Sequence, residues 1–175
     1  MQDTGKLARF DQAVVPHLDA AYNLARWLMR NEQDAEDMVQ EACLRAFTFF
    51  HNFQGEDGRA WLLAIVRNTC YTWLKKNHAH ELDAVFEEQM HSVEADTANP
   101  EVVLLRKADR EFLQQLLEQL PTEFREVLIL RELEGMSYKQ ISAIADLPIG
   151  TVMSRLARAR KRLEQQLAMR TRMET

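Results

Sequence analysis

Residues Ser137 to Leu163 read SYKQISAIADLPIGTVMSRLARARKRL and carry the clearest structural pattern in the chain. Ser137 followed by Gln140 is a capping-box pattern, which predicts the start of a short helix with apolar side chains on one face. Pro148 cannot continue that helix, but it suits the first turn of a second one. The stretch therefore predicts two helices joined by a tight turn.

The second of these helices separates an apolar stripe from a polar and basic one. Residues at i, i+4, i+7 and i+11 form the apolar stripe, namely Val152, Leu156, Ala159 and Leu163. The neighbouring stripe contains Thr151, Ser154, Arg155, Arg158 and Arg162. Arginine and hydroxyl side chains bind bases and phosphates, so the pattern favours a helix-turn-helix that places its second helix in the DNA major groove. A solvated amphipathic helix with a basic outer face is the alternative.

The distribution of charge supports DNA binding better than the total charge does. The chain has 175 residues, enough for one medium or two small domains, and its formal net charge is −5. Residues 151–172 nevertheless include seven basic and one acidic side chain, whereas residues 77–105 include seven acidic and no basic ones. Because DNA affinity responds to the local field more than to the total, the basic segment is compatible with a DNA contact.

Nearly every periodic segment has helical spacing, and no sustained strand alternation is present, so we expect an all-α fold. Two small helical domains are predicted at residues 1–76 and 101–175, joined by an acidic linker at 77–100. The C-terminal domain contains the helix-turn-helix. The expected helices cover residues 7–29 with a kink at Pro16, then 34–51, 59–76, 101–119, and a segment from Pro121 to Gly135.

The helix expected at residues 59–76 places basic and aromatic side chains together. Arg67, Asn68, Tyr71 and Lys75 share its more polar side. Rings beside cations suit single-stranded nucleic acid, because bases stack on the rings while cations follow the backbone. The preceding polar loop, with Gln54, Glu56 and Asp57, offers groups that can hold a flipped base. The alternative is that the aromatic residues are core, which would apply to Phe47, Phe50, Trp61 and Trp73.

Three segments in this order resemble the extracytoplasmic-function (ECF) group of bacterial sigma factors, and the match covers about residues 10–163. The segments are DAEDMVQEACLRAF (34–47), AWLLAIVRNTCYTWLKK (60–76) and LPTEFREVLILRELEGMSYKQISAIADLPIGTVMSRLARARKRL (120–163). The resemblance implies that the first segment binds RNA polymerase, the second recognises and melts the minus-ten promoter element, and the third recognises the minus-thirty-five element. A stand-alone helix-turn-helix regulator and a helical protein-interaction module are the competing hypotheses.

The family roles carry over to individual positions. The implied polymerase-binding residues are Asp34, Asp37, Gln40 and Glu41. The implied minus-ten residues are His51, Asn52, Gln54, Arg59, Arg67, Asn68, Tyr71 and Lys75, and residues 51–59 match the loop that captures an unstacked base. The implied minus-thirty-five residues are Thr151, Met153, Ser154, Arg155, Ala157, Arg158 and Arg162. Ser154 and Arg158 match contacts to bases or phosphates, whereas Arg155 contacts phosphate or braces the domain. Met153 departs from the basic or polar residue of many relatives and Ala157 offers only a methyl group, so DNA shape is expected to contribute more.

The resemblance implies three partners: core RNA polymerase, promoter DNA and an anti-sigma factor. No catalytic constellation, cofactor motif or metal-ligand spacing stands out, so we expect neither an enzyme nor a bound cofactor or metal. His78, His80 and His91 fit no strong metal template. Cys43 and Cys70 are expected to be buried, reduced thiols. The sequence contains no stretch of membrane-spanning length and no signal-peptide core, which predicts a cytoplasmic protein without membrane insertion.

Overall fold

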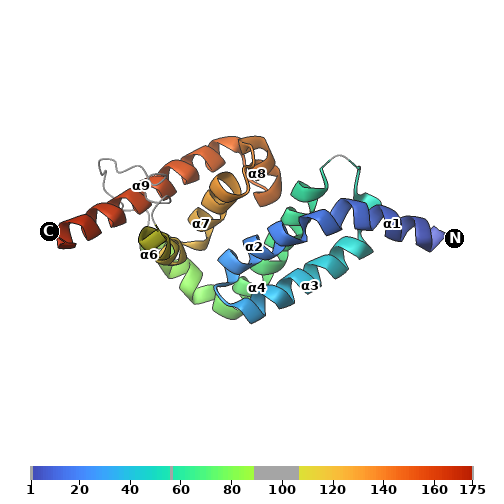
Figure 1. Ribbon diagram of the computed structural model, residues 1–175, viewed down its shortest axis with the longest axis horizontal. Coiled ribbons are helices and arrows are strands. Elements are labelled where there is room, and N and C mark those ends of the chain that lie inside the picture. The colour runs from blue at the N-terminus through green and yellow to red at the C-terminus, as the bar shows by residue number, and fades with distance from the viewer. Residues whose placement is uncertain (1, 56, 89–106, 175) are drawn as a thin grey trace.

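The computed structural model describes residues 2–55, 57–88 and 107–174, and helices occupy most of these ranges. No strand occurs within them, which confirms the expected all-α fold. Figure 1 shows an elongated molecule whose two termini lie at opposite ends. Helices α1 (Gln2–Val14), α2 (Leu18–Met29), α3 (Glu32–Thr48) and α4 (Gly58–Glu88) form the N-terminal half.

The break that was expected at Pro16 lies between α1 and α2. Pro16 falls inside a short 3-10 turn, η1 (Val15–His17), because its ring removes a backbone donor and stops the α-helical ladder. At the other end of α2, Arg30 adopts a left-handed conformation with φ of 62°. Asn31 then starts α3, and its side chain accepts a hydrogen bond from the Asp34 backbone N–H at 3.0 Å.

Helix α4 is longer than the expected helix at residues 59–76. It begins at Gly58, after a short turn η2 (Phe50–Asn52) and the loop 53–57, and its backbone continues to Glu88. No glycine or proline interrupts residues 77–88, so nothing in the covalent chain forces the helix to stop at Lys76. The first part of the predicted linker 77–100 is therefore helical, and residues 89–100 of it lie outside the described residues.

The C-terminal half contains α6 (Lys107–Gln119), α7 (Thr122–Leu128), α8 (Tyr138–Ala145) and α9 (Ile149–Glu174). Between α7 and α8, the chain passes through a π-helical turn η4 (Ile129–Leu133) and Gly135, whose φ is 64°. Helix α9 continues past the helix-turn-helix, and its Leu163 and Leu167 pack with Leu113 and Leu116 of α6. This second small core ties α6 to the recognition helix.

The main hydrophobic core extends through both halves of the molecule. In the N-terminal half, alanines let the helices approach closely: Ala21 and Ala25 of α2 and Ala35 and Ala42 of α3 are fully buried. The same cluster continues into residues of α7, α8 and α9, including Val127, Ile141, Val152 and Leu156. Because one core cluster spans both halves, the two halves are packed against each other rather than held apart by their connection.

Candidate nucleic-acid interface

The helix-turn-helix is capped as its sequence predicts. The Ser137 side chain accepts a hydrogen bond from the Gln140 backbone N–H at 3.1 Å, and the Gln140 side chain accepts one from the Ser137 backbone N–H at 2.9 Å. Asp146 ends α8 in a left-handed conformation with φ of 54°. Pro148 directly precedes α9, and its carbonyl accepts hydrogen bonds from the backbone N–H groups of Thr151 and Val152 in the first turn of that helix. These local bonds fix the angle at which α9 leaves the turn.

Helix α9 buries its apolar stripe and exposes much of the predicted DNA-facing stripe. Val152, Leu156, Ala159 and Leu163 are all buried, as expected. Met153, Ser154, Ala157 and Arg158 are exposed, whereas Thr151, Arg155 and Arg162 are half-buried. Burial raises the pKa of the Glu126 carboxyl, and the Arg155 guanidinium lies close enough to act against that rise, which favours a bracing role for Arg155. Arg158 is the arginine that the helix presents most openly among the predicted contacts.

Arg160 has a different role on the same helix. Its Nη2 donates to Glu132 Oε1 at 2.7 Å, and this ion pair ties α9 to the π-helical turn η4. The pair is about 40% exposed on both sides, so it contributes only about 0–1 kcal/mol. Arg160 is not among the predicted DNA contacts.

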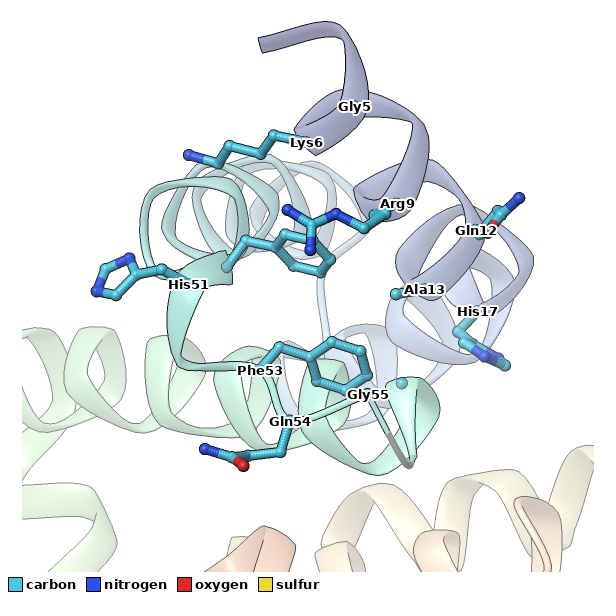
Figure 2. A pocket seen from close by; sticks show the side chains of 12 residues that line it. Gly5, Lys6, Arg9, Gln12, Ala13, His17, His51, Phe53, Gln54 and Gly55 are labelled. Carbon is cyan, nitrogen blue, oxygen red and sulfur yellow. The ribbon is translucent and has the colours of Figure 1, made fainter. Parts of the chain in front are cut away.

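The loop 53–57 borders a pocket of about 1260 Å³ between α1, η2 and the start of α4. Figure 2 shows Phe53 facing this hollow, with Arg9 of α1 extending over it from the opposite wall. His51 and Gln54, two of the predicted minus-ten residues, line the pocket, whereas Asn52 and Arg59 are not among its lining residues. The structure thus brings part of the predicted base-capture set to one concave site.

An aromatic cluster holds the loop in place. Phe50 is buried and packs against Phe53 at 5.6 Å between ring centroids, and Phe53 packs against Trp61 at 5.1 Å. Phe10 of α1 meets Phe50 edge-on at 5.6 Å. The alternative that these aromatics are core therefore holds for Phe50. Phe47, however, leaves 39% of its surface exposed.

The predicted contacts on α4 divide into two groups. Asn68 and Lys75 are exposed on the helix surface. Arg67 and Tyr71 instead point at Glu126 of α7: Arg67 Nε donates to Oε1 at 2.6 Å, and the Tyr71 hydroxyl donates to Oε2 at 2.7 Å. The Arg67 guanidinium also lies over the Tyr71 ring at 3.8 Å. Glu126 of the C-terminal half therefore binds two side chains, Arg67 and Tyr71, that were expected to face promoter DNA.

Burial sets the electrostatics around Glu126, whose side chain is fully buried. Burial raises the pKa of the Glu126 carboxyl, although Arg67 and the Tyr71 hydroxyl act in the opposite direction. Burial, together with the nearby Glu126, also raises the pKa of Tyr71 well above its ordinary value. Burial lowers the pKa of Arg67, but its ion pair with Glu126 outweighs that effect and raises the pKa overall.

Further polar contacts join the two halves. Asp57 accepts a hydrogen bond from the Ala60 backbone N–H at 3.0 Å and another from the Gln140 side chain of α8 at 2.9 Å. The bond from Ala60 is the main cause of the lowered pKa of Asp57. Asn23 Nδ2 donates to Glu134 Oε1 at 2.9 Å, and Arg59 Nη2 approaches the Met136 sulfur at 3.4 Å. The start of α4 is thus tied directly to the helix-turn-helix through Asp57 and Gln140.

The predicted polymerase-binding residues lie on the outer side of α3. Asp37, Gln40 and Glu41 are exposed and Asp34 is half-buried, so the four share an accessible surface. Leu44 lies one turn further along and is 70% exposed, so it adds an apolar group at the end of this acidic surface. The sequence did not single out Leu44, although its i+3 and i+4 spacing from Glu41 and Gln40 was a usable signal.

Glu126 was also missed, because its importance depends on a contact with residues more than fifty positions away. The two cysteines were expected to be buried thiols, and both are free; Cys70 is buried as expected, whereas Cys43 is only half-buried.

The side chains of His78 and His80 and the whole of His91 lie outside what the structure describes. Among the residues it does describe, no group of histidine, cysteine and acidic side chains could hold a metal ion. Nor does any helix in those ranges have the length and apolar character needed to cross a bilayer.

The chain thus carries a helix-turn-helix, a separate aromatic pocket and an exposed acidic face on α3, and the class of protein that combines them follows from comparison with known proteins. Two family descriptions match the chain: Sigma-70 region 2 over residues 13–80 and Sigma-70 region 4 over residues 110–163. The ECF RNA polymerase sigma-E factor of Escherichia coli K12 is 36% identical over 138 residues, which cover 75% of this chain and 72% of that protein. The chain therefore belongs to the ECF RNA polymerase sigma factors.

Other relatives support the same assignment. The ECF RNA polymerase sigma factor SigE of Mycolicibacterium smegmatis is 34% identical over 166 residues, covering 95% of this chain but only 64% of that protein. The sigma factor RpoE in complex with the anti-sigma factor NepR from Bartonella quintana gives a TM-score of 0.68 at 29% identity, with 91% of this chain and 96% of that chain covered. CnrH in complex with the cytosolic domain of CnrY gives 0.64 at 25% identity, with 91% and 88% covered.

Proposed function

We propose that this sigma factor binds core RNA polymerase and directs it to promoters that carry two separate DNA elements. The observation that carries the proposal is the presence of two distinct DNA-suited surfaces on one chain. The exposed basic side of α9 suits duplex DNA in the major groove, and the aromatic pocket beside loop 53–57 suits an unstacked base. Joining two weak DNA contacts raises the overall affinity through effective concentration.

The acidic face of α3 is proposed to dock on the polymerase. Asp37, Gln40 and Glu41 supply charge and hydrogen-bonding groups, and the exposed Leu44 supplies the apolar contact that a stable interface requires. The chain performs no chemical step in this role, since RNA polymerase catalyses the synthesis of RNA. The proposed place of action is the cytoplasm, where polymerase and promoter DNA are found.

An anti-sigma factor is the proposed regulator. Support comes from the likeness to a sigma factor solved in complex with an anti-sigma factor, which extends over 91% of this chain and therefore includes both halves. An inhibitor of this kind would cover the surface on α3 that is proposed to bind polymerase. The contact between Glu126 and the α4 residues Arg67 and Tyr71 shows that the two halves can also cover part of the proposed DNA surface themselves.

Run-off transcription tests the proposal directly. Core RNA polymerase is mixed with the full chain and a genomic pool of promoter fragments, and the transcripts are sequenced. We expect transcripts that begin downstream of a shared pair of DNA elements and that require the added chain. Sequence-specific DNA binding without polymerase, combined with no transcript, would support a stand-alone regulator instead. An absence of any salt-dependent DNA binding would support a protein-interaction module.

A further inference from the structure

Helix α1 forms one wall of the aromatic pocket beside Phe53, and no role has been assigned to this wall. The region 2 match begins at residue 13, so most of α1 lies before it. Lys6 and Arg9 of this helix nevertheless line the pocket together with His17 of η1. None of the described residues that line the pocket is acidic, so this part of the lining offers cationic and aromatic groups. This combination suits an anion that is attached to a planar ring.

The position of α1 against the pocket is built into the backbone. A Cβ atom on Gly58 would lie 2.3 Å from the carbonyl oxygen of Ala13, so only glycine lets α1 come this close to the start of α4. Phe10 adds a second anchor, because its ring packs edge-on against Phe47 at 5.2 Å and Phe50 at 5.6 Å. Arg9 directly precedes Phe10, so the same packing holds its backbone beside the pocket.

Of the two α1 cations that line the pocket, Lys6 and Arg9, it is Arg9 that remains available to a ligand. Lys6 is engaged, since its ammonium lies 4.4 Å from the centre of the Phe47 ring. Arg9 is exposed and makes no ion pair or hydrogen bond through its side chain with the described part of the chain. Figure 2 shows its guanidinium extending over the hollow above Phe53, whereas Gln12 of the same helix points away.

The size of the pocket fits a strand rather than a small molecule. Its volume of about 1260 Å³ is above the roughly 300–1000 Å³ that is usual for small-ligand sites. A base that stacks on the half-buried Phe53 ring would place its sugar and phosphate toward the rim, where the guanidinium of Arg9 lies. Guanidinium groups bind phosphate oxygens with charge-assisted, bidentate hydrogen bonds.

We propose that Arg9 binds a backbone phosphate of the unwound promoter strand whose base enters the pocket beside Phe53. The proposal rests on the proposed function, because it requires a strand that the holoenzyme has opened. Arg9 supplies affinity and positions the strand, while the loop side chains supply the choice of base. Helix α1 is therefore part of the minus-ten site.

The test uses holoenzyme made from core polymerase and the full chain, with fork templates that expose the minus-ten segment of the non-template strand as single-stranded DNA. Arg9→Ala is expected to weaken binding roughly five- to tenfold at low salt and to lower the slope of log K against log salt by about 0.7. Arg9→Lys should recover much of the affinity. Arg172→Ala is the matched control, because Arg172 is an exposed cation near the C-terminal end of α9, at the opposite end of the molecule from α1 (Figure 1).

A second measurement separates phosphate binding from base recognition. The Arg9→Ala loss should be the same for all four bases at the captured position, and it should persist when that position is abasic. The loss caused by Phe53→Ala should instead disappear on the abasic template, because no base remains to stack. An unchanged salt slope for Arg9→Ala, or a loss that depends on the base, would overturn the assignment. If wild-type holoenzyme fails to bind the templates at all, the proposed function fails rather than the role of Arg9.

Discussion

Individual residues show how the same type of side chain takes different roles on one helix. Arg158 and Arg160 lie two positions apart on α9, yet Arg160 is bonded to Glu132 at 2.7 Å, whereas Arg158 is exposed on the predicted DNA side. Arg155 lies close to the buried Glu126. The helical spacing of the arginines predicted a basic stripe, but only the tertiary contacts divide that stripe into bracing and DNA-facing members.

The exposed position of Arg158 leads to a prediction about promoter choice. Arg158→Ala should weaken promoter recognition by about 1–3 kcal/mol and relax the preference at one base pair, if Arg158 meets a base edge. Arg160→Ala removes the same charge from the same helix but leaves the DNA-facing side intact, so its promoter preference should equal that of the wild type. Competition binding of holoenzyme against a library of minus-thirty-five variants measures both. Unchanged selectivity for Arg158→Ala would remove it from the base contacts.

The two cysteines should differ in reactivity because their surroundings differ. Burial, with a contribution from Glu126, raises the pKa of Cys70 from 9.0 to about 12, whereas Cys43 is only half-buried. At pH 8 the thiolate fraction of Cys70 is therefore roughly a thousandfold below that of an ordinary thiol. Since the raised pKa favours the neutral thiol in the folded state, this contribution to stability is present below pH 9 and is lost as pH rises toward 12.

Iodoacetamide labelling at pH 8, followed by peptide mass spectrometry, checks this difference. Cys43 should be modified first, and Cys70 only as fast as the protein opens or unfolds. Both should react alike in denaturant, where burial no longer distinguishes them. Equal rates for the two thiols in the native protein would contradict the burial of Cys70.

At the scale of elements, α3 combines an N-cap, a buried alanine face and an exposed acidic face. Asn31 caps its start, and Ala35, Met38, Ala42 and Ala46 face the core. The opposite side presents Asp37, Gln40, Glu41 and Leu44. Because the buried face fixes the rotation of the helix, the four outward side chains form one surface that is ready for a partner without further folding.

The docking surface on α3 can be tested with a pair of matched double variants. Asp37→Ala with Gln40→Ala should lower polymerase affinity at least tenfold, about 1.4 kcal/mol or more, because both side chains lie in the proposed interface. Glu111→Ala with Gln115→Ala removes the same two groups from an exposed face of α6 and should leave the affinity unchanged. Surface plasmon resonance with immobilised core polymerase measures the affinities, and circular dichroism checks the fold. Normal polymerase binding by the α3 variant would exclude this docking site.

Across the whole molecule, the two halves close on each other around a buried carboxylate. Glu126 accepts hydrogen bonds from Arg67 and Tyr71, and Gln140 bonds to Asp57 at the rim. These α4 side chains cannot contact a promoter while they are bonded to Glu126. Promoter binding through Arg67 and Tyr71 therefore requires the C-terminal half to move away from α4.

Two substitutions of Glu126 separate loss of charge from loss of an acceptor. Glu126→Gln removes the charge but keeps a polar partner for both side chains, because its amide oxygen can accept from Arg67 and its amide NH2 can donate to the Tyr71 hydroxyl, so contact between the two halves should persist. Glu126→Leu leaves the Arg67 guanidinium and the Tyr71 hydroxyl without their carboxylate partner, which costs about 1–3 kcal/mol. This variant should therefore favour an open form, in which the two halves have separated. Small-angle X-ray scattering should show a larger radius of gyration for the Leu variant alone. Equal radii for all three proteins would contradict this role of Glu126.

Local patterns account for the elements that could be predicted. The capping box at Ser137, the break at Pro16 and the stripe from Val152 to Leu163 depend on residues within a few positions of each other, and all three were confirmed. The continuation of α4 to Glu88 was not expected, because an acidic, weakly periodic segment resembles a linker even when no residue breaks the helix. The spacing of apolar residues in the sequence did not reveal that α1 forms a wall of the pocket.

Short-range spacing of apolar, capping and basic residues was enough to predict the helices, the helix-turn-helix and the family. The partners of those residues are instead set by the packing of the helices. Arg67 and Tyr71 bind Glu126 across the two halves, and Arg9 reaches the pocket because Gly58 admits the backbone of Ala13. These contacts join residues far apart in the chain, and no local period encodes them. They arise only when the helices are packed around their shared core.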